Sequence, residues 1–228
     1  MSELYDIFRE HPHISTDTRD IGADSIFFAL RGATFDGNRF AADALEKGAA
    51  YAVVDDPSLP NTRPDKADRL IVVDDALQTL QTLAREHRRE LGLPILAITG
   101  SNGKTTTKEL VSRVLAEKYE VYATRGNLNN HIGVPLSILR AAPSDEAAVW
   151  EMGMNHSGEL APLCEMTLPK IGIITSIGTS HMEYLGSREN IAREKCTLAR
   201  CLPEDGFMIF PADCDYADMI RQSTRAAC

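Results

Sequence analysis

The chain has 228 residues, of which 43% are hydrophobic and 25% charged, which is enough to bury one substantial core or two modest ones. Its net charge of -9 argues against a nucleic-acid partner, because binding a phosphate backbone requires a basic face. No long apolar run is present, and the N-terminal segment lacks the apolar centre of a signal peptide, so we expect a cytoplasmic protein without membrane insertion. The five cysteines show no CxxC pair and no metal-ligand spacing, which predicts reduced thiols.

The first part of the chain is predicted to form a small α/β domain. Residues 25–30 (SIFFAL) are a short apolar strand, and residues 40–48 (FAADALEKG) have helical spacing and end in a glycine that stops the helix. Two further strands are expected at residues 49–56 and 69–75, separated by a polar loop with three prolines. The apolar period of residues 76–91 predicts the last helix of this domain.

Gly92 and Pro94 interrupt the chain after that helix, so we place the domain boundary between residues 1–91 and residues 92–228. In the second domain, short apolar strands alternate with helices. This pattern predicts an α/β domain with a parallel sheet that helices cover on both faces. Its strands are predicted at residues 95–99, 120–124, 147–152, 172–178 and 207–211, and its first helix at residues 106–119.

A phosphate-binding loop is predicted between the strand that ends at Thr99 and the helix that begins near Thr105. Glycines let the backbone turn so that successive N–H groups point inward, and the helix N-terminus adds partial positive charge. Lys104 supplies a cation, and the Thr105 hydroxyl is suited to Mg²⁺. The loop is two residues shorter than GxxxxGK[ST], but its strand and helix lie where phosphate binding requires them. The residues expected to bind the nucleotide are Gly100, Ser101, Asn102, Gly103, Lys104, Thr105 and Thr106.

The order of motifs in the chain resembles that of the Mur ligases. TGSNGKTTT resembles the abbreviated phosphate loop that Mur ligases share with folylpolyglutamate synthases, and GNLNNHIGVPLSIL, EMGMNHSGEL, ITSIGTSHMEYLGS and NIAREK follow in the family's order. Earlier in the chain, STDTR, FFALRG and FDGNRF resemble the family's UDP-binding domain. Folylpolyglutamate synthases lack that domain, which disfavours them. The resemblance therefore covers nearly the whole chain and implies a UDP-binding domain followed by a P-loop ATPase domain.

Within the family, the EMG tripeptide followed by a GE pair is similar to the branch that adds D-alanyl-D-alanine. This resemblance implies an ATP-dependent ligase that joins D-alanyl-D-alanine to UDP-N-acetylmuramoyl-tripeptide through an acyl phosphate, in peptidoglycan synthesis. We expect a monomer. Ligases of this family are about twice as long and have a third domain, so we also expect an incomplete fragment, with a truncated ATPase domain, that does not turn over alone.

The resemblance also implies catalytic and metal-binding roles. Lys104 would neutralise the β- and γ-phosphates of ATP, and Thr105 with Glu151 would hold one Mg²⁺. His181 and a carbamylated Lys195 would hold a second Mg²⁺. Simpler alternatives remain open at this stage: a solvated acid at a strand end, an ordinary loop histidine and a helix-surface lysine.

Two groups of polar residues are expected to bind the UDP-linked substrate. Asparagines and glycines also form ordinary turns, and the threonine and arginines are equally consistent with a helix cap and exposed side chains. The resemblance assigns the following residues to substrate binding: Thr18, Arg19 and Arg31 for uridine and pyrophosphate, and Asn127, Asn129 and Asn130 in the second domain.

Three other functions are weighed against this ligase. A non-catalytic module would bind UDP-muramoyl-peptide without releasing phosphate from ATP. A folylpolyglutamate-synthase-like ligase would not need the first domain. A small-molecule kinase would share the phosphate loop, but nothing in the chain resembles a kinase lid, and the asparagine-rich and EMG motifs have no explanation in a kinase.

Overall fold

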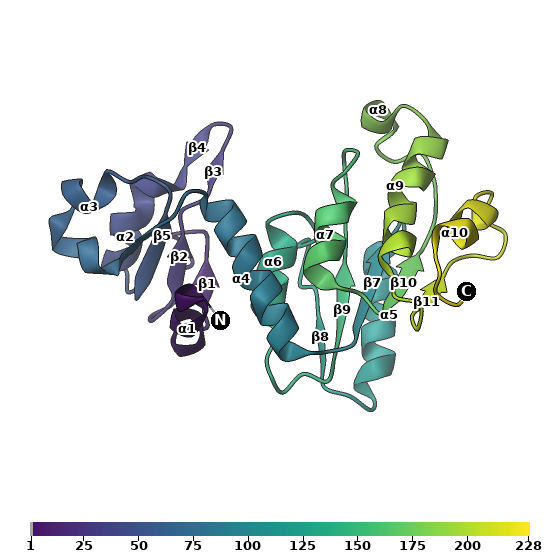
Figure 1. Cartoon of the computed structure of the whole chain (residues 1–228), viewed down its shortest axis with the longest axis horizontal. Coiled ribbons are helices and arrows are strands. Elements are labelled where there is room, and N and C mark those ends of the chain that lie inside the picture. Colours follow the sequence, from purple (N-terminus) through teal and green to yellow (C-terminus); the bar gives the residue numbers. More distant parts are fainter. Residues whose placement is uncertain (1) are drawn as a thin grey trace. The chain divides into compact units, whose positions relative to one another are not determined.

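The computed structural model describes residues 2–228, and the chain divides into two compact units, Met1–His87 and Arg88–Cys228 (Figure 1). Helix α4 (Ala76–Leu91) has the bounds that its apolar period predicts. The division falls inside this helix, whereas the sequence placed it at the end. The reason is that Arg88 is buried and donates hydrogen bonds within the second unit, to the carbonyl oxygens of Thr167 (2.7 Å) and Leu93 (2.8 Å). Among residues 2–228, no helix is both long and apolar enough to cross a membrane.

The first unit is built on a parallel sheet. Its central strands are continuous apolar runs, which is the pattern expected of strands that are buried on both faces. Its elements before α4 are α1 (Glu3–Glu10), β1 (Ile14–Ser15), β2 (Ile26–Phe28), β3 (Arg31–Gly32), β4 (Phe35–Asp36), η1 (Gly37–Phe40), α2 (Ala41–Glu46), β5 (Tyr51–Val54), α3 (Leu59–Thr62), η2 (Pro64–Arg69) and β6 (Leu70–Val72). The sheet order is β1-β2-β5-β6, and β3 pairs with β4 in an antiparallel hairpin. Phe27 of β2 shares a core with Ala44 and Leu45 of α2.

Two segments of the first unit differ from the sequence prediction. The segment predicted as a polar loop contains α3 and the 3-10 helix η2. Two of its prolines, Pro60 and Pro64, lie in the first turn of these helices, where an N–H group would have no partner within the helix. Helix α1 was not predicted; Ser2 caps it by accepting a hydrogen bond from the Tyr5 N–H, and Tyr5 and Phe8 are buried.

The second unit contains a five-stranded sheet in the order β11-β10-β7-β9-β8, with all neighbouring strands parallel. This confirms the predicted α/β fold class. Its elements after α4 are β7 (Ile95–Thr99), α5 (Lys104–Ala116), β8 (Val121–Ala123), α6 (Gly133–Ile138), β9 (Ala147–Glu151), α7 (Leu160–Thr167), β10 (Ile171–Ile174), α8 (Met182–Leu185), α9 (Arg188–Cys201), β11 (Phe207–Ile209) and α10 (Ala217–Ser223).

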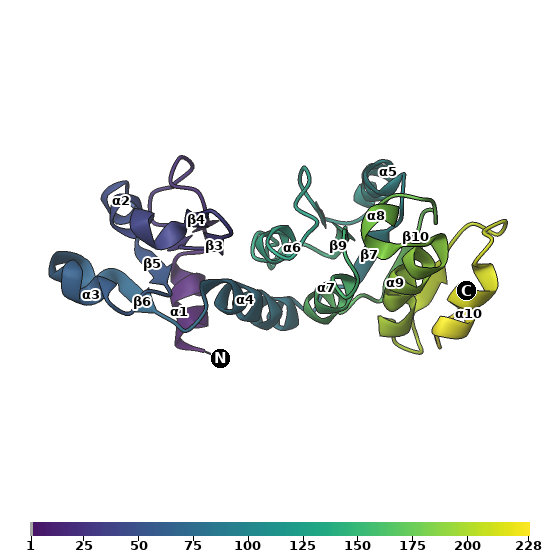
Figure 2. The same ribbon diagram turned by 90° about the horizontal axis from the view of Figure 1, so that it is seen from above.

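Helices cover both faces of this sheet, as the apolar strands predicted. On one face, Val111 of α5 packs against a cluster that includes Ile98 of β7 and Val149 of β9. On the other face, Leu198 of α9 lies next to Gly172 of β10. Figure 2 shows α5 on one side of the strands, with α7 and α9 on the other. A sheet buried in this way leaves only its edges and strand ends available for a site.

The carboxyl ends of β7, β9 and β10 meet at one edge of the sheet. Ile98 is in register with Glu151, and Thr99 is in register with Ile174, so the three strands end at nearly the same level. The loops that follow these strands therefore open on the same edge, which is where open α/β sheets bind ligands.

Gly133, the first residue of α6, lies in close contact with the asparagine-rich segment before it. A Cβ atom added at this position would overlap the backbone of Leu128. We therefore expect Gly133→Ala to lower the free energy of unfolding by about 2 kcal/mol, as overpacking typically does. Gly22→Ala is the control, because an added Cβ would meet no atom within 4 Å there. Urea denaturation of the two variants measures the effect, and equal stability of both would contradict this packing.

Candidate nucleotide and magnesium site

The predicted phosphate loop joins β7 to α5, which begins at Lys104, within two residues of the predicted start. Gly103 has a φ of 83°, a left-handed conformation that glycine adopts without strain. An added Cβ at Gly100 would overlap the Thr175 hydroxyl. The Lys104 ammonium group donates a hydrogen bond to the Gly100 carbonyl oxygen at 2.8 Å. Both glycines are thus required by the local geometry, and the lysine lies over the loop.

The loop that follows β10 fastens the phosphate loop. The Ser101 N–H donates to the Ser176 carbonyl oxygen at 2.9 Å, and the Ser101 hydroxyl accepts from the Gly178 N–H at 2.9 Å. The Asn102 N–H donates to the Ser176 hydroxyl at 3.0 Å. The conformation of the phosphate loop therefore depends on a segment more than seventy residues away in sequence.

Thr105 and Glu151 form a pair of oxygen ligands beside this loop. The Thr105 hydroxyl donates to the Glu151 carboxylate at 2.8 Å, and the Asn129 amide donates to its other oxygen at 2.8 Å. Glu151 is only 3% exposed, so it is not the solvated strand-end acid that the sequence left open. A buried carboxylate held by neutral donors at the mouth of a phosphate loop has the oxygen chemistry that Mg²⁺ prefers.

Lys195 lies in the middle of α9 and is 2% exposed, which excludes the helix-surface alternative. Burial, together with the positive charge of Lys104, lowers the pKa of Lys195 to about 7, although the Glu194 carboxylate acts in the opposite direction. Near neutral pH, a large fraction of this amine is therefore uncharged. A neutral amine is the form that can react with an electrophile such as CO₂.

Glu194, which the sequence analysis did not single out, ties α9 to the EMG motif. Its carboxylate accepts hydrogen bonds from the Gly158 N–H (3.0 Å) and the Leu160 N–H (3.1 Å). Leu160 begins α7, so this carboxylate also compensates the helix N-terminus. Only its place next to Lys195 in the NIAREK motif could have drawn attention to it.

His181 lies in the loop between β10 and α9, immediately before α8. Its φ of 65° is left-handed, which is uncommon for a residue with a side chain. Within residues 2–228, no three His, Cys, Asp or Glu side chains lie close enough together to hold a metal ion by themselves. A hydrogen bond joins Thr105 to Glu151, whereas within residues 2–228 no hydrogen bond joins His181 to Lys195.

The three predicted asparagines have different surroundings. Asn129 contacts Glu151, as described above, and its carbonyl oxygen accepts from the Gly153 N–H at 2.8 Å. The Asn130 side chain instead accepts hydrogen bonds from the N–H groups of Ile132 and Gly133, which is the turn-forming alternative. Asn127 is exposed in the same loop.

A separate pocket of about 340 Å³ in the first unit contains two of the predicted substrate residues, Thr18 and Arg19. Phe35 and Phe40 also line it, with their rings stacked at an interplanar angle of 10° and centroids 5.4 Å apart. They are 52% and 38% exposed, an unusual exposure for phenylalanine. Arg19 lowers the pKa of the neighbouring Asp17 to about 2, so a positive and a negative group lie side by side at the rim.

Arg31, the third predicted residue of the first domain, is not among the residues that line this pocket. Its guanidinium group donates to the Asp55 carboxylate at 2.7 Å and to the Asp55 carbonyl oxygen at 3.2 Å. The Asn38 amide donates to the same carboxylate at 2.6 Å. The exposed arginine that the sequence analysis allowed is thus also a structural link between β3 and the end of β5.

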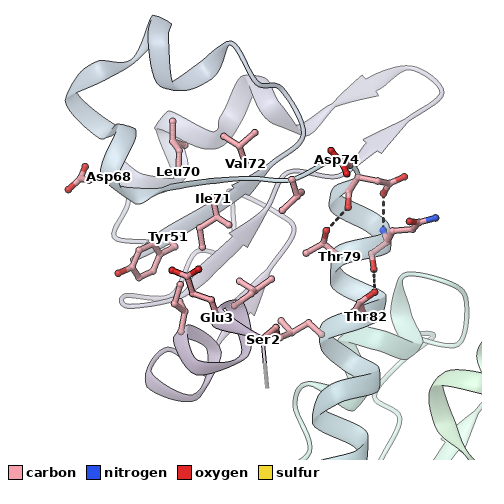
Figure 3. Close-up of a pocket in the computed structure, with 16 residues that line it drawn as sticks. Ser2, Glu3, Tyr51, Asp68, Leu70, Ile71, Val72, Asp74, Thr79 and Thr82 are labelled. Atoms are coloured by element: carbon pink, nitrogen blue, oxygen red, sulfur yellow. Dashed lines mark hydrogen bonds between the residues drawn. The ribbon is translucent and has the colours of Figure 1, made fainter.

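A larger hollow of about 930 Å³ runs along β6, the N-terminal end of α1 and one side of α4 (Figure 3). Its lining is mixed, with apolar side chains such as Ile71 next to the acidic side chains of Glu3, Asp68 and Asp74. None of the residues that the sequence analysis assigned to a site lines this hollow.

Comparison with known proteins matches both units to the same family. The Mur ligase middle domain matches residues 98–228, and the catalytic domain of the Mur ligase family matches residues 11–88. The UDP-N-acetylmuramoyl-tripeptide--D-alanyl-D-alanine ligase of Bacillus subtilis is 46% identical over 200 residues, which are 88% of this chain and 43% of that protein. The chain thus spans less than half the length of the curated relatives it matches.

Solved structures give the same result. A crystal structure of MurF from Acinetobacter baumannii has a TM-score of 0.86 and 34% identity, covering 93% of this chain and 46% of that one. MurF ligase from Thermotoga maritima, solved in complex with ADP, has a TM-score of 0.85 and 29% identity, covering 99% of this chain and 51% of that one. Because the middle-domain match alone covers more than half of its residues, the chain belongs to the Mur ligase family.

Proposed function

We propose that this chain carries the nucleotide-binding and UDP-substrate-binding parts of a ligase that adds D-alanyl-D-alanine to UDP-N-acetylmuramoyl-tripeptide at the expense of ATP. The observation that carries the proposal is the Thr105–Glu151 pair, 2.8 Å apart beside a glycine-rich phosphate loop. The choice of substrates rests on the names of the relatives described above.

The proposed reaction activates a carboxylate. The substrate carboxylate would take the γ-phosphoryl group of ATP to give an acyl phosphate, and the dipeptide amine would then displace phosphate to form an amide. Most of the work in phosphoryl transfer is positioning and charge neutralisation. Lys104 would neutralise phosphate charge, and Thr105 and Glu151 would bind one Mg²⁺, which supplies further neutralisation when bound.

Lys195 is proposed to carry CO₂ as a carbamate. Its neutral amine would form a bond to the carbon of CO₂ and release one proton, which converts a buried amine into an anion. This is supported by the burial of Lys195 and by its pKa of about 7. The carbamate and His181 would provide oxygen and nitrogen ligands for a second Mg²⁺.

The pocket with the stacked phenylalanines is proposed to hold the UDP group. Aromatic faces bind nucleobases by stacking, and the neighbouring Arg19 guanidinium suits phosphate oxygens. The asparagine-rich loop and Asn129 in particular would contact the substrate near the reacting carboxylate, since Asn129 already reaches Glu151.

Isothermal titration of the 228-residue chain with UDP-N-acetylmuramoyl-tripeptide, followed by a phosphate-release assay with Mg-ATP and D-alanyl-D-alanine, tests the proposal. Binding of the UDP substrate and of Mg-ADP is expected. Dipeptide-dependent phosphate release would establish the ligase directly. A folded chain that binds the UDP compound but no nucleotide would support the non-catalytic alternative, and a chain that binds neither would refute both.

Thr105→Val is expected to weaken ADP binding about tenfold when Mg²⁺ is present and to leave it unchanged in EDTA, because the hydroxyl contributes to the metal and not to the phosphates. Ser112→Ala is the control: its hydroxyl lies on the same helix but donates to the Lys108 carbonyl oxygen, away from the phosphate loop. Titration with ADP under both conditions gives the answer. Equal losses with and without Mg²⁺ would contradict the assigned role.

Phe35→Ala and Phe40→Ala are each expected to weaken UDP binding about tenfold, which corresponds to the lower end of measured base-stacking energies. Phe207→Ala is the matched control, since Phe207 is similarly exposed but lies on β11 of the other unit. The measurement is titration with UDP alone. Unchanged affinity in both pocket variants would place the uracil elsewhere.

A further inference from the structure

We propose that Lys108 is a positioning residue of the magnesium site, which anchors the end of β8 so that Thr124 holds the backbone of Glu151. The inference rests on the proposed function, because the site in question is the one assigned above to a magnesium-bound nucleotide. Lys108 itself contacts none of the atoms assigned to ligand binding.

The ammonium group of Lys108 is buried and forms its hydrogen bond within the protein. The side chain is 2% exposed, and Nζ donates a hydrogen bond to the Thr124 carbonyl oxygen at 2.6 Å. A second contact is an ion pair of 2.8 Å with Glu109, whose side chain is mostly exposed. A buried ammonium group is costly unless it is hydrogen-bonded, so the contact with Thr124 offsets the cost of placing a lysine here.

Thr124 connects this lysine to Glu151. It directly follows β8, and its N–H continues the ladder by donating to the Val149 carbonyl oxygen at 3.1 Å. Its hydroxyl accepts a hydrogen bond from the Glu151 N–H at 3.0 Å. One residue therefore receives Lys108 at its carbonyl and holds the backbone of the proposed magnesium ligand at its hydroxyl.

Helix α5 thus reaches Glu151 by two routes. Thr105 donates directly to the carboxylate, and Lys108, three residues later on the same helix face, acts through Thr124. The first route fixes the position of the carboxylate oxygens, and the second fixes the position of the Glu151 backbone. Partners beyond the metal ligands commonly change metal affinity by ten- to a hundredfold, although they touch no metal.

Amide hydrogen exchange of Glu151, measured by NMR on the 228-residue chain without ligands, tests the anchor itself. Lys108→Met and Thr124→Val are each expected to accelerate exchange of this amide at least tenfold relative to the wild-type chain. Thr124→Ser keeps both the carbonyl and the hydroxyl and should retain protection. Glu109→Gln removes only the exposed ion-pair partner and should leave exchange unchanged. Wild-type protection in Lys108→Met would overturn the proposal.

The magnesium dependence of ADP binding tests the consequence for the site. Lys108→Met and Thr124→Val should each raise the Mg²⁺ concentration for half-maximal stimulation about tenfold, with ADP affinity in EDTA unchanged. An equal loss of ADP affinity in EDTA and in Mg²⁺ would show a merely structural role and overturn the inference. If the wild-type chain shows no magnesium-dependent binding, the proposed function fails, while the Glu151 exchange rate still decides whether Lys108 anchors this strand end.

Discussion

Lys104→Met is expected to weaken Mg-ADP binding about a hundredfold, because a hydrogen bond to a charged phosphate contributes up to about 3 kcal/mol. Lys104 occupies the first position of α5, and its ammonium group donates to the Gly100 carbonyl oxygen. A phosphate in the loop would offer it a charged acceptor instead. Titration of wild-type and variant chains with Mg-ADP measures the loss.

The same variant has a second expected effect, on a residue in another helix. The charge of Lys104 contributes to the lowered pKa of Lys195, so removing that charge should raise the pKa of Lys195 towards its ordinary value.

Lys118→Met is the control for the Mg-ADP titration, as it removes an exposed lysine just beyond α5. If Lys104→Met binds Mg-ADP as tightly as Lys118→Met, the phosphate role of Lys104 is wrong.

For Lys195, we expect the free energy of unfolding to rise with pH above about 7. In the folded chain this amine loses its proton near pH 7, whereas in the unfolded chain it keeps the proton up to its ordinary pKa of 10.5. Between these values the unfolded state binds more protons, so raising the pH favours the folded state. The cost of the buried charge is present in full below pH 7 and disappears by about pH 10.

The size of this effect is roughly 5 kcal/mol over the whole interval of about 3.5 pKa units, because each pKa unit corresponds to about 1.4 kcal/mol. Lys195→Met should remove the pH dependence and be more stable than the wild-type chain at pH 7. Urea denaturation between pH 6 and 10 in CO₂-free buffer measures both. Lys118→Met should keep the wild-type slope, and parallel curves for wild type and Lys195→Met would show that Lys195 titrates normally.

The parts of the fold that repeat a simple period were predictable from the sequence. The helix from Ala76 to Leu91 carries apolar residues at helical period on one face, and its predicted bounds are those of α4. The strand predicted at 172–178 ends at Ile174 instead. The Ser176 carbonyl oxygen and the Gly178 N–H instead form hydrogen bonds with Ser101 of the phosphate loop. Contacts between segments so far apart in the sequence cannot be read from a local residue pattern.

The candidate site was predictable where the residues of one short motif determine the local backbone conformation. The glycines and Lys104 predict a phosphate loop because their backbone and charge requirements are local. The burial of Lys195 could not be predicted, since a lysine in a charged stretch has the same sequence pattern whether it faces solvent or the protein interior. The stacking of Phe35 on Phe40 depends on the hairpin and the 3-10 helix that bring the two rings together. The spacing of the two residues in the sequence does not predict this contact.

The loop between β10 and α9 is attached at both of its ends to parts of the proposed site. Its first residues, 175–178, hold the phosphate loop, and its last residues lead into the helix that carries Lys195. Its length is therefore fixed by two independent anchors. Deleting a single residue between Thr179 and Gly186 would have to be absorbed at one anchor or the other. This stretch should consequently tolerate changes of side chain far better than changes of length.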